Sequence, residues 1–365
     1  MAKEPAKKAS TNPAALRTEL ERTDRELLKL LNARTATALK LIQALGPGAL
    51  EPAAGEMQPV LERAVEHNKG PLTNDTVRHV FRELLGGTRA LQRHERVAFL
   101  GPDYSYSHLA ALERFGASIA QVPLGSIAAV FEEVNRGQVE FGVVPIENST
   151  DGRVVDTLDM FTRLRVRICG EVQLRIHHAL LGRCPRSDVV EVYSKPQALS
   201  QCRNWLAKHL PNARTVEVTS TSIAAELAHD KEGAAAIASL QAGMHYGLDA
   251  LAQSIEDNQT NLTRFAVIGH ESAPRSGRDQ MALMFEIEHK PGGLADALAI
   301  FKRNRLNLTW IESFPIARPE GGYMFFVELD GHENDSRVTK ALAALERRAV
   351  RLEILGSFPR SLPVD

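Results

Sequence analysis

The hydrophobic pattern changes its period at Val97, and this change divides the chain into parts that cannot share one fold. From Ala14 to Leu45 apolar residues recur at three- and four-residue steps, the spacing of one face of a long helix. After Val97 short apolar runs typical of strands alternate with helical patterns. We therefore expect a solvated tail at residues 1–13, an all-α domain at residues 14–95 and an α/β region after it.

The all-α domain is expected to hold three helices. The first spans Ala14–Leu45, residues 46–55 connect it to a second near Val60–His67, and a third begins after Thr73 and carries through Leu91. A first helix over ~45 Å long cannot bury its apolar stripe in so thin a domain. We therefore expect the chain to dimerise.

The central region, residues 96–273, is typical of an α/β domain with largely parallel sheets. Ligands of such sheets bind at the carboxyl ends of the strands, where helix N-termini favour anions. The run Glu171–Leu181 looks extended and is expected to cross between two lobes. The expected strands are Val97–Leu100, Phe141–Val144, Val189–Tyr193, Val216–Val218 and Ala235–Ala238, and the expected helices are Ser107–Phe115, Val154–Arg163, Pro196–His209, Ser222–His229 and Leu240–Tyr246.

A third unit, residues 280–359, follows a linker at Ala273–Gly277. Its elements are predicted in the order βαββαβ, with a turn at Pro319–Gly322. This α+β arrangement is more often a regulator than a catalyst. The expected strands are Ala282–Glu288, Leu308–Ile316, Tyr323–Leu329 and Val350–Leu355, and the expected helices are Gly292–Asn304 and Ser336–Arg348.

The composition of the chain limits which partners it can bind and where in the cell it can work. A formal net charge of −1 argues against nucleic acid or an anionic membrane as the main partner. Cys169, Cys184 and Cys202 have no CxxC spacing, which favours reduced packing cysteines over a disulfide or zinc site. No apolar run approaches the ~18 residues of a membrane helix, and the first residues lack the apolar core of a secretory signal. We expect a cytoplasmic protein.

Hydroxyl and amide side chains gather at several predicted strand ends. Thr263 and Arg264 precede the apolar run Ala266–Ile268; a hydroxyl there can donate a proton or hydrogen bond to a leaving oxygen, and a guanidinium can grip a carboxylate. A single cleft built from these groups would suit a small, polar, multiply charged substrate. The other clusters are Ser105 and Ser107, residues 147–150, Ser194, and residues 219–222.

Four short motifs follow one another in the central region. They are Gly101-Pro102-Asp103-Tyr104-Ser105-Tyr106-Ser107, Val144-Pro145-Ile146-Glu147-Asn148-Ser149, Tyr193-Ser194 with Gln201-Cys202, and Asn261-Leu262-Thr263-Arg264-Phe265. In this order they resemble the bacterial P-protein family, in which a chorismate-mutase-type helical domain is fused to a prephenate dehydratase domain and an ACT domain. The resemblance covers Leu16 to Pro359 and implies a two-lobed α/β domain of the kind found in periplasmic binding proteins.

The resemblance implies conversion of prephenate to phenylpyruvate, CO₂ and water in phenylalanine biosynthesis, without metal or organic cofactor. It places Thr263 nearest the departing hydroxyl; Glu147, Asn148, Ser194 and Gln201 complete the polar wall, and Arg264, Ser105 and Ser107 bind carboxylates. The simpler alternatives are a surface threonine at 263, helix capping by Glu147 and Asn148, and capping or a solvated face for Ser194 and Gln201.

Tyr104 stands where the family usually has glycine, which predicts a differently shaped loop.

In the helical domain Arg17, Arg34, Thr88 and Gln92 match the family's mutase residues. Arg17 and Arg34 lie ~25 Å apart along one helix, so one ligand reaches both only if a partner chain supplies one of them. The family's lysine falls at Leu45, which predicts a weak or inactive mutase domain kept for dimerisation. The alternative is a rearranged site that uses Lys40 and Gln92.

The C-terminal unit carries the two stretches that bind phenylalanine in the family's ACT domains. They match Gly292, Gly293 and Leu294, and Glu312 and Ser313, whereas Phe314 replaces an arginine. The resemblance therefore implies inhibition by L-phenylalanine in a homodimer or larger assembly; the simpler alternative is a helix start and a packing phenylalanine. Two other functions stay open: arogenate as the substrate, and a non-catalytic sensor.

Overall fold

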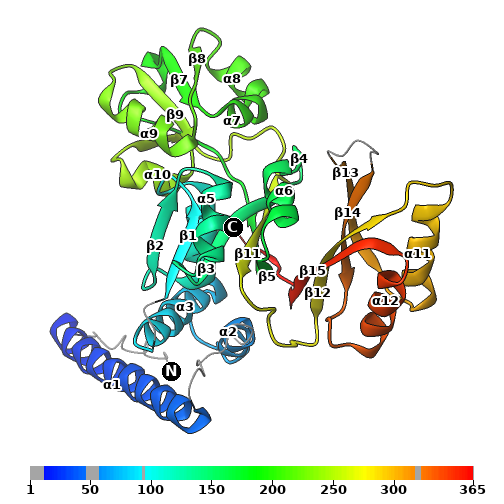
Figure 1. The fold of residues 1–365 in the computed structure, drawn as a ribbon. Helices are drawn as coiled ribbons and strands as arrows, with labels where there is room; N and C mark the ends of the chain where they lie inside the picture. Colours follow the sequence, from blue (N-terminus) through cyan, green and yellow to red (C-terminus); the bar gives the residue numbers. More distant parts are fainter. Residues whose placement is uncertain (1–11, 47–56, 93–94, 317–321, 365) are drawn as a thin grey trace, which may run out of the picture.

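The computed structural model describes residues 12–46, 57–92, 95–316 and 322–364. Helices at the N-terminus lie beneath a two-lobed α/β region, and a C-terminal sheet-and-helix unit lies beside the first of its two lobes (Figure 1). The expected order of an all-α, a two-lobed α/β and an α+β part is confirmed. Most of the predicted connection at 46–55 and of the turn at Pro319–Gly322 lies outside the described residues.

The N-terminal helices are α1 (Pro13–Leu45), α2 (Met57–Glu66) and α3 (Asn74–Ala90). Thr73 caps α3 by accepting a hydrogen bond from the backbone of Thr76. Met57 and Leu61 of α2 pack with Leu85 of α3 into a small core. Most leucines of α1 are exposed, for example Leu20 at 64%, whereas Ala38 is buried, so most of the apolar stripe of the long helix is uncovered within the described part of this chain.

The first lobe is built on a seven-stranded sheet in the order β16-β5-β11-β3-β1-β2, with β4 paired to β3. Its core contains Val144, Phe131 and Ile268. The strands are β1 (Arg96–Leu100), β2 (Ala120–Leu124), β3 (Phe141–Asn148), β4 (Gly152–Arg153), β5 (Arg167–Arg175), β11 (Leu262–Gly269) and β16 (Pro363–Val364), and the helices are α4 (Tyr106–Phe115), α5 (Ile127–Asn135) and α6 (Val155–Arg163).

The second lobe is built on a five-stranded sheet in the order β10-β6-β9-β7-β8. Small side chains such as Ala224, Ala225 and Ala236 bring its helices close to the sheet. The strands are β6 (Ala179–Gly182), β7 (Glu191–Ser194), β8 (Arg214–Glu217), β9 (Ala234–Ala238) and β10 (Asp249–Ala252), and the helices are α7 (Pro196–Gln201), α8 (Arg203–His209), α9 (Thr221–Asp230), α10 (Leu240–His245) and the short 3-10 helix Arg186–Asp188.

The prediction of largely parallel sheets is wrong, because the chain crosses between the lobes twice. It leaves the first lobe after β5 and returns along β11, which inserts antiparallel to both β3 and β5. In the second lobe β6 likewise pairs antiparallel with β9 and β10. The predicted crossing at Glu171–Leu181 is confirmed, since that run forms the end of β5 and the start of β6. The single helix predicted over Pro196–His209 is broken at Cys202.

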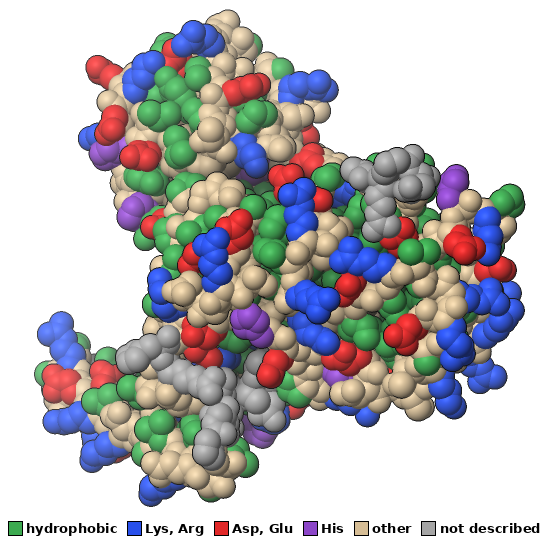
Figure 2. Space-filling model, viewed as in Figure 1, with side chains coloured by type: hydrophobic (Ala, Val, Ile, Leu, Met, Phe, Trp, Pro, Cys, Tyr) green, Lys and Arg blue, Asp and Glu red, His purple; other side chains and the backbone are tan. Residues whose placement is uncertain are grey.

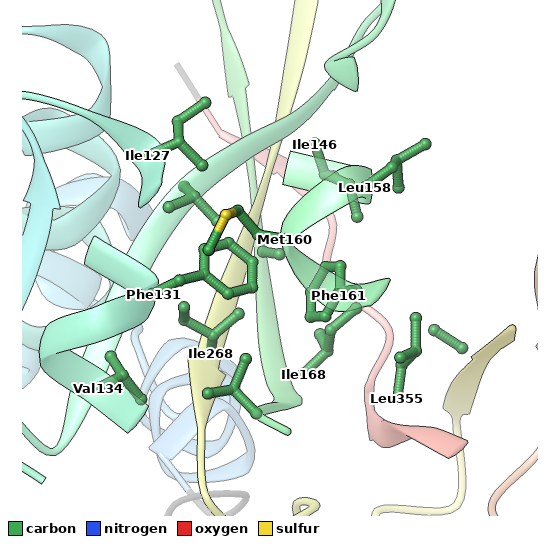
Figure 3. Close-up of a cluster of buried hydrophobic side chains, with 14 of the residues drawn as sticks. Ile127, Phe131, Val134, Ile146, Leu158, Met160, Phe161, Ile168, Ile268 and Leu355 are labelled. Atoms are coloured by element: carbon green, nitrogen blue, oxygen red, sulfur yellow. The ribbon is translucent and has the colours of Figure 1, made fainter. Parts of the chain in front are cut away.

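The C-terminal unit has the predicted βαββαβ order, with its sheet in the order β13-β14-β12-β15. One face of this sheet shares a core with the first lobe: Leu355 packs near Phe161 and Ile168 (Figure 3). The C-terminal unit is therefore fused to the first lobe by buried apolar contacts. Its elements are β12 (Asp279–Ile287), α11 (Gly293–Arg303), β13 (Leu308–Pro315), β14 (Tyr323–Asp330), α12 (Ser336–Glu346) and β15 (Ala349–Pro359).

Gly356 sets how closely this unit approaches the first lobe. Its φ is +135°, and a Cβ at this position would lie 2.3 Å from the carbonyl oxygen of Ile168 on β5. The backbones of β15 and β5 can meet at this point only because no side chain stands between them.

We predict that Gly356→Ala destabilises the protein by about 3 kcal/mol or more, since both the positive φ and the backbone clash must be relieved. Gly277→Ala is the matched control, because Gly277 has φ +90° with open space around it and should cost only about 1 kcal/mol. Chemical denaturation of the two variants measures the difference. Equal losses would contradict the proposed close approach.

Candidate active site

The site forms where β3 and β11 run side by side. In their register Thr263 is opposite Asn148, and Arg264 is opposite Glu147. Successive side chains of a strand point to opposite faces of a sheet. Thr263 and Asn148 therefore share one face, and Arg264 and Glu147 share the other. The expectation that Glu147 lines the same wall as Thr263 is corrected by this register.

The Asn148 side chain is held in one orientation by its own turn. Its Oδ1 accepts hydrogen bonds from the backbone N–H of Thr150, at 2.9 Å, and of Asp151, at 3.0 Å. The amide nitrogen is thereby directed at Thr263 Oγ1, 2.8 Å away, and at Asn261 Oδ1, 2.9 Å away. Because Thr263 Oγ1 accepts a hydrogen bond, its own proton is left to be donated. The alternative that Glu147 and Asn148 cap the next helix is wrong, since α6 has no side-chain cap.

The polar network continues from the first lobe into the second. Asn261 Nδ2 donates to Gln201 Oε1 over 3.0 Å, and Gln201 Nε2 donates to Asp151 Oδ2 over 3.2 Å. The second lobe stands as a separate rounded mass above the first lobe (Figure 2). Gln201, at the end of α7, thus ties the second lobe to the pair Thr263 and Asn148.

His178 extends this network and was not predicted from the sequence. Its Nε2 lies 3.0 Å from Gln201 Oε1 and its Nδ1 lies 3.1 Å from the Tyr106 hydroxyl. Burial lowers the pKa of His178, so the ring is neutral, and the Gln201 oxygen fixes the proton on Nε2. The backbone N–H of His178 donates to Glu256. The sequence does place this histidine in the predicted crossing between the lobes. It does not show which residues the imidazole would contact, so it gave no reason to assign His178 to the site.

The predicted serines position elements of the fold. Ser194 Oγ is buried and donates to the carbonyl of Ile237 over 2.6 Å, which joins β7 to β9. Ser105 caps α4 by accepting from the backbone of His108, and it donates to the carbonyl of Leu100. Ser107 is buried within α4. The expectations that Ser194 completes the polar wall and that Ser105 binds a carboxylate are corrected, because backbone groups already use both hydroxyls.

Tyr104 adopts a backbone conformation that favours glycine. Its φ is 60°, in the left-handed region, which costs a tyrosine about 1 kcal/mol or more. Its ring stacks on His245 of the second lobe with centroids 4.0 Å apart, and its backbone N–H donates to His108 Nδ1 over 2.8 Å. These contacts offset the strain, and a loop shaped differently from that of the family stays a prediction.

Arg264 does not face the network, and its guanidinium is occupied by three protein carboxylates. Nη1 binds Glu147 at 2.9 Å, and Nε and Nη2 bind two buried carboxylates, Glu171 and Glu328, each at 2.8 Å. Trp310 covers the guanidinium, with its ring centroid 5.4 Å from Cζ. Burial raises the pKa of Glu328 to about 7, and Arg264 opposes that rise. The expectation that Arg264 grips a substrate carboxylate is corrected on this geometry.

The mutase-type residues lie apart from this network. Arg34 Nη1 donates to the buried Thr88 Oγ1 over 3.2 Å, which brings these two residues together. Arg17 is exposed more than four turns away along α1, and Gln92 lies beyond the end of α3. Leu45, at the place of the family's lysine, is 62% exposed.

The two effector stretches lie at the start of α11 and on the edge strand β13. Gly292 has φ +80°, in the left-handed region, and Gly293 begins the helix; Leu294 is half-buried beside the core. On β13 Ser313 is exposed, whereas Glu312 forms an ion pair with Arg153 of β4. Phe314 packs against the core shared with the first lobe, as the packing alternative predicts.

Within the residues that the structure describes, no helix combines the length and the apolar character needed to cross a membrane.

Comparison with known proteins gives family matches along most of the chain. Models of three families match it in order: chorismate mutase type II at residues 16–93, prephenate dehydratase at residues 97–273 and the ACT domain at residues 281–347. A bifunctional chorismate mutase/prephenate dehydratase of Stutzerimonas stutzeri is 40% identical over 356 residues, which cover 95% of this chain and 98% of the relative.

Two solved structures resemble this protein over 73% of its chain each. The prephenate dehydratase of Arthrobacter aurescens in complex with L-Phe has a TM-score of 0.68 at 33% identity, with 90% of that chain covered. A protein described as a novel type of quorum quenching acylase has a TM-score of 0.67 at 28% identity, with 98% of that chain covered. Because similar folds carry different activities, the reaction has to be argued from the site.

Proposed function

The chain belongs to the family of bifunctional chorismate mutase/prephenate dehydratases, and on this premise we propose that it is a lyase that converts prephenate to phenylpyruvate, CO₂ and water in phenylalanine biosynthesis. The observation that carries the proposal is the Asn148–Thr263 pair, which leaves the threonine proton free for a leaving oxygen. The domain limits 14–95, 96–273 and 280–359 belong to the same proposal.

The proposed reaction needs one proton and no electrons from outside the substrate. The bond from the ring to the departing carboxylate breaks, its electron pair enters the ring, and the C4–O bond breaks as aromaticity forms. Thr263 donates its hydrogen bond to the leaving hydroxyl, which takes up a proton and departs as water. Asn148 keeps Thr263 oriented toward that oxygen, and Gln201 and Asn261 hold the two lobes around the ring.

Because Arg264 is occupied, the substrate carboxylates require other donors. Two helices begin after strands of the two sheets: Ser105 caps α4 after β1, and Ser220 caps α9 after β8. The backbone N–H groups of the first turn of such helices attract anions. We assign carboxylate binding to these two helix starts, with Ser107 in the first turn of α4.

The N-terminal helices are proposed to serve dimerisation first. The exposed leucines of α1 form an apolar stripe that a helix of a partner chain would cover in a homodimer or larger assembly. A mutase site would need Arg17 of the partner beside Arg34 and Thr88, and Leu45 supplies no cation for the ether oxygen. We therefore propose weak or absent mutase activity; a site rearranged around Lys40 and Gln92 is the alternative.

L-phenylalanine is the proposed effector, bound at Gly292–Leu294 and at Glu312 and Ser313. The supporting observation is the likeness to an L-Phe complex of a prephenate dehydratase, and Phe314 is expected to weaken the inhibition by L-phenylalanine.

A cytoplasmic location follows from the proposed biosynthetic role. Arogenate as substrate and a non-catalytic sensor are the two alternative functions.

Feeding purified protein prephenate and chorismate separately tests the function. We predict phenylpyruvate from prephenate and, because the mutase-type site lacks its cation, little or none from chorismate, followed by absorbance of the product. Phenylpyruvate from both substrates would contradict the weak mutase. Binding of prephenate without product would favour the sensor, and faster turnover of arogenate would change the substrate.

Thr263→Ala is predicted to lower kcat by ~10²–10⁴-fold, because the donor to the leaving hydroxyl is lost, with KM within a few-fold. Thr263→Ser is the matched control, since it keeps the hydroxyl opposite Asn148 and should retain most of the activity. Unchanged kcat in Thr263→Ala would remove this hydroxyl from the mechanism.

A further inference from the structure

The C-terminal unit contacts the strands of the proposed site on the face of the sheet opposite the site. Thr263 and Asn148 face the polar network, whereas their sequence neighbours Arg264 and Glu147 face the opposite side of the sheet. Adjacent Cα atoms are only about 3.8 Å apart. A shift of Arg264 or Glu147 therefore moves the residues of the site almost equally.

Arg264 reaches out of the first lobe to two strands of the C-terminal unit. Its Nη2 lies 2.8 Å from Oε2 of the buried Glu328 on β14. Trp310, opposite Glu328 in the register of β13 and β14, covers the guanidinium. On the face of the sheet opposite the site, β11 is therefore bound to the C-terminal unit by the ion pair of Arg264 with Glu328 and by the contact of Arg264 with the Trp310 ring.

A second ion pair joins the same two parts beside the site. Arg153 of β4 contacts Glu312 of β13. Arg153 lies opposite Glu147 in the pairing of β4 with β3 and follows the turn that fixes Asn148. Strand β13, which carries a proposed effector stretch, therefore contacts the site through the turn as well as through Arg264.

We propose that Arg264 and Glu328 are positioning residues of the dehydratase site, through which the C-terminal unit holds the strands that carry Thr263 and Asn148. This inference rests on the proposed function. Neither side chain touches substrate: their effect is to keep the threonine hydroxyl and its asparagine partner in register, because displacement of a catalytic group by about 1 Å is enough to slow a reaction a hundredfold.

One ion pair between the two parts lies away from the site and serves as a control. Arg167 of β5 also binds the C-terminal unit, through Glu333 at 3.0 Å. Arg167 is paired with Gly269, at the far end of β11 from Thr263. Removal of Glu333 thus weakens the same junction without touching the part of the strand that carries the site.

The test compares Glu328→Ala with Glu333→Ala in the full chain. We predict that Glu328→Ala lowers kcat for prephenate about tenfold with KM within twofold, whereas Glu333→Ala leaves both within twofold. Glu328→Gln, which can still accept a hydrogen bond from Arg264, is predicted to restore kcat to within threefold of the parent. Hydrogen exchange should rise at residues 147–153 and 261–264 in Glu328→Ala more than in Glu333→Ala.

Equal effects of the two alanine variants on kcat would overturn the proposal, as would an unchanged kcat in Glu328→Ala. If the parent protein gives no phenylpyruvate, the proposed function fails, and hydrogen exchange alone decides whether Glu328 positions these strands. Should Glu328→Ala not fold, Glu328→Met, which fills a similar volume but cannot bind Arg264, is compared with Glu333→Met by the same measurements. A larger loss of kcat and more hydrogen exchange at residues 147–153 and 261–264 in Glu328→Met support the proposal, and equal effects overturn it.

Discussion

Adjacent side chains of a β-strand must point to opposite faces of the sheet, and on β11 this constraint gives one strand two roles. Thr263 meets Asn148 on one face, and Arg264 binds Glu147, Glu171 and Glu328 on the other. Because β11 is the strand that returns from the second lobe, it also sets how that lobe joins the first. The proposed chemistry, the lobe connection and the contact with the C-terminal unit therefore depend on one register.

The two faces are held by different physical interactions. On the site face, Asn148 has its oxygen occupied by backbone donors, so its nitrogen can only point toward Thr263 and Asn261. On the reverse face three carboxylates surround one guanidinium, and loss of one partner from a buried pair typically costs about 3–5 kcal/mol. A rigid amide orients the hydroxyl, and a buried ion cluster fixes the strand beneath it.

The sequence allowed the three-part architecture to be predicted because long helices and apolar strands carry strong periodic signals. It also indicated that Thr263 and Asn148 meet, and they do. What it did not reveal depends on register and on contacts distant in sequence. The reversal of β11 places Arg264 and Glu147 behind the site, and the backbone partners of Ser194 become visible only once β9 lies beside β7. The left-handed turn at Tyr104 places its ring against His245 in the other lobe.

A crystal structure with an unreactive analogue of prephenate that keeps the 4-hydroxyl tests the central claim most directly. The account predicts that this hydroxyl lies within hydrogen-bond distance of Thr263 Oγ1 while Asn148 still donates to the same oxygen, and that Arg264 stays bound to Glu328. A ligand carboxylate seated on the Arg264 guanidinium, or a hydroxyl distant from Thr263, would contradict it.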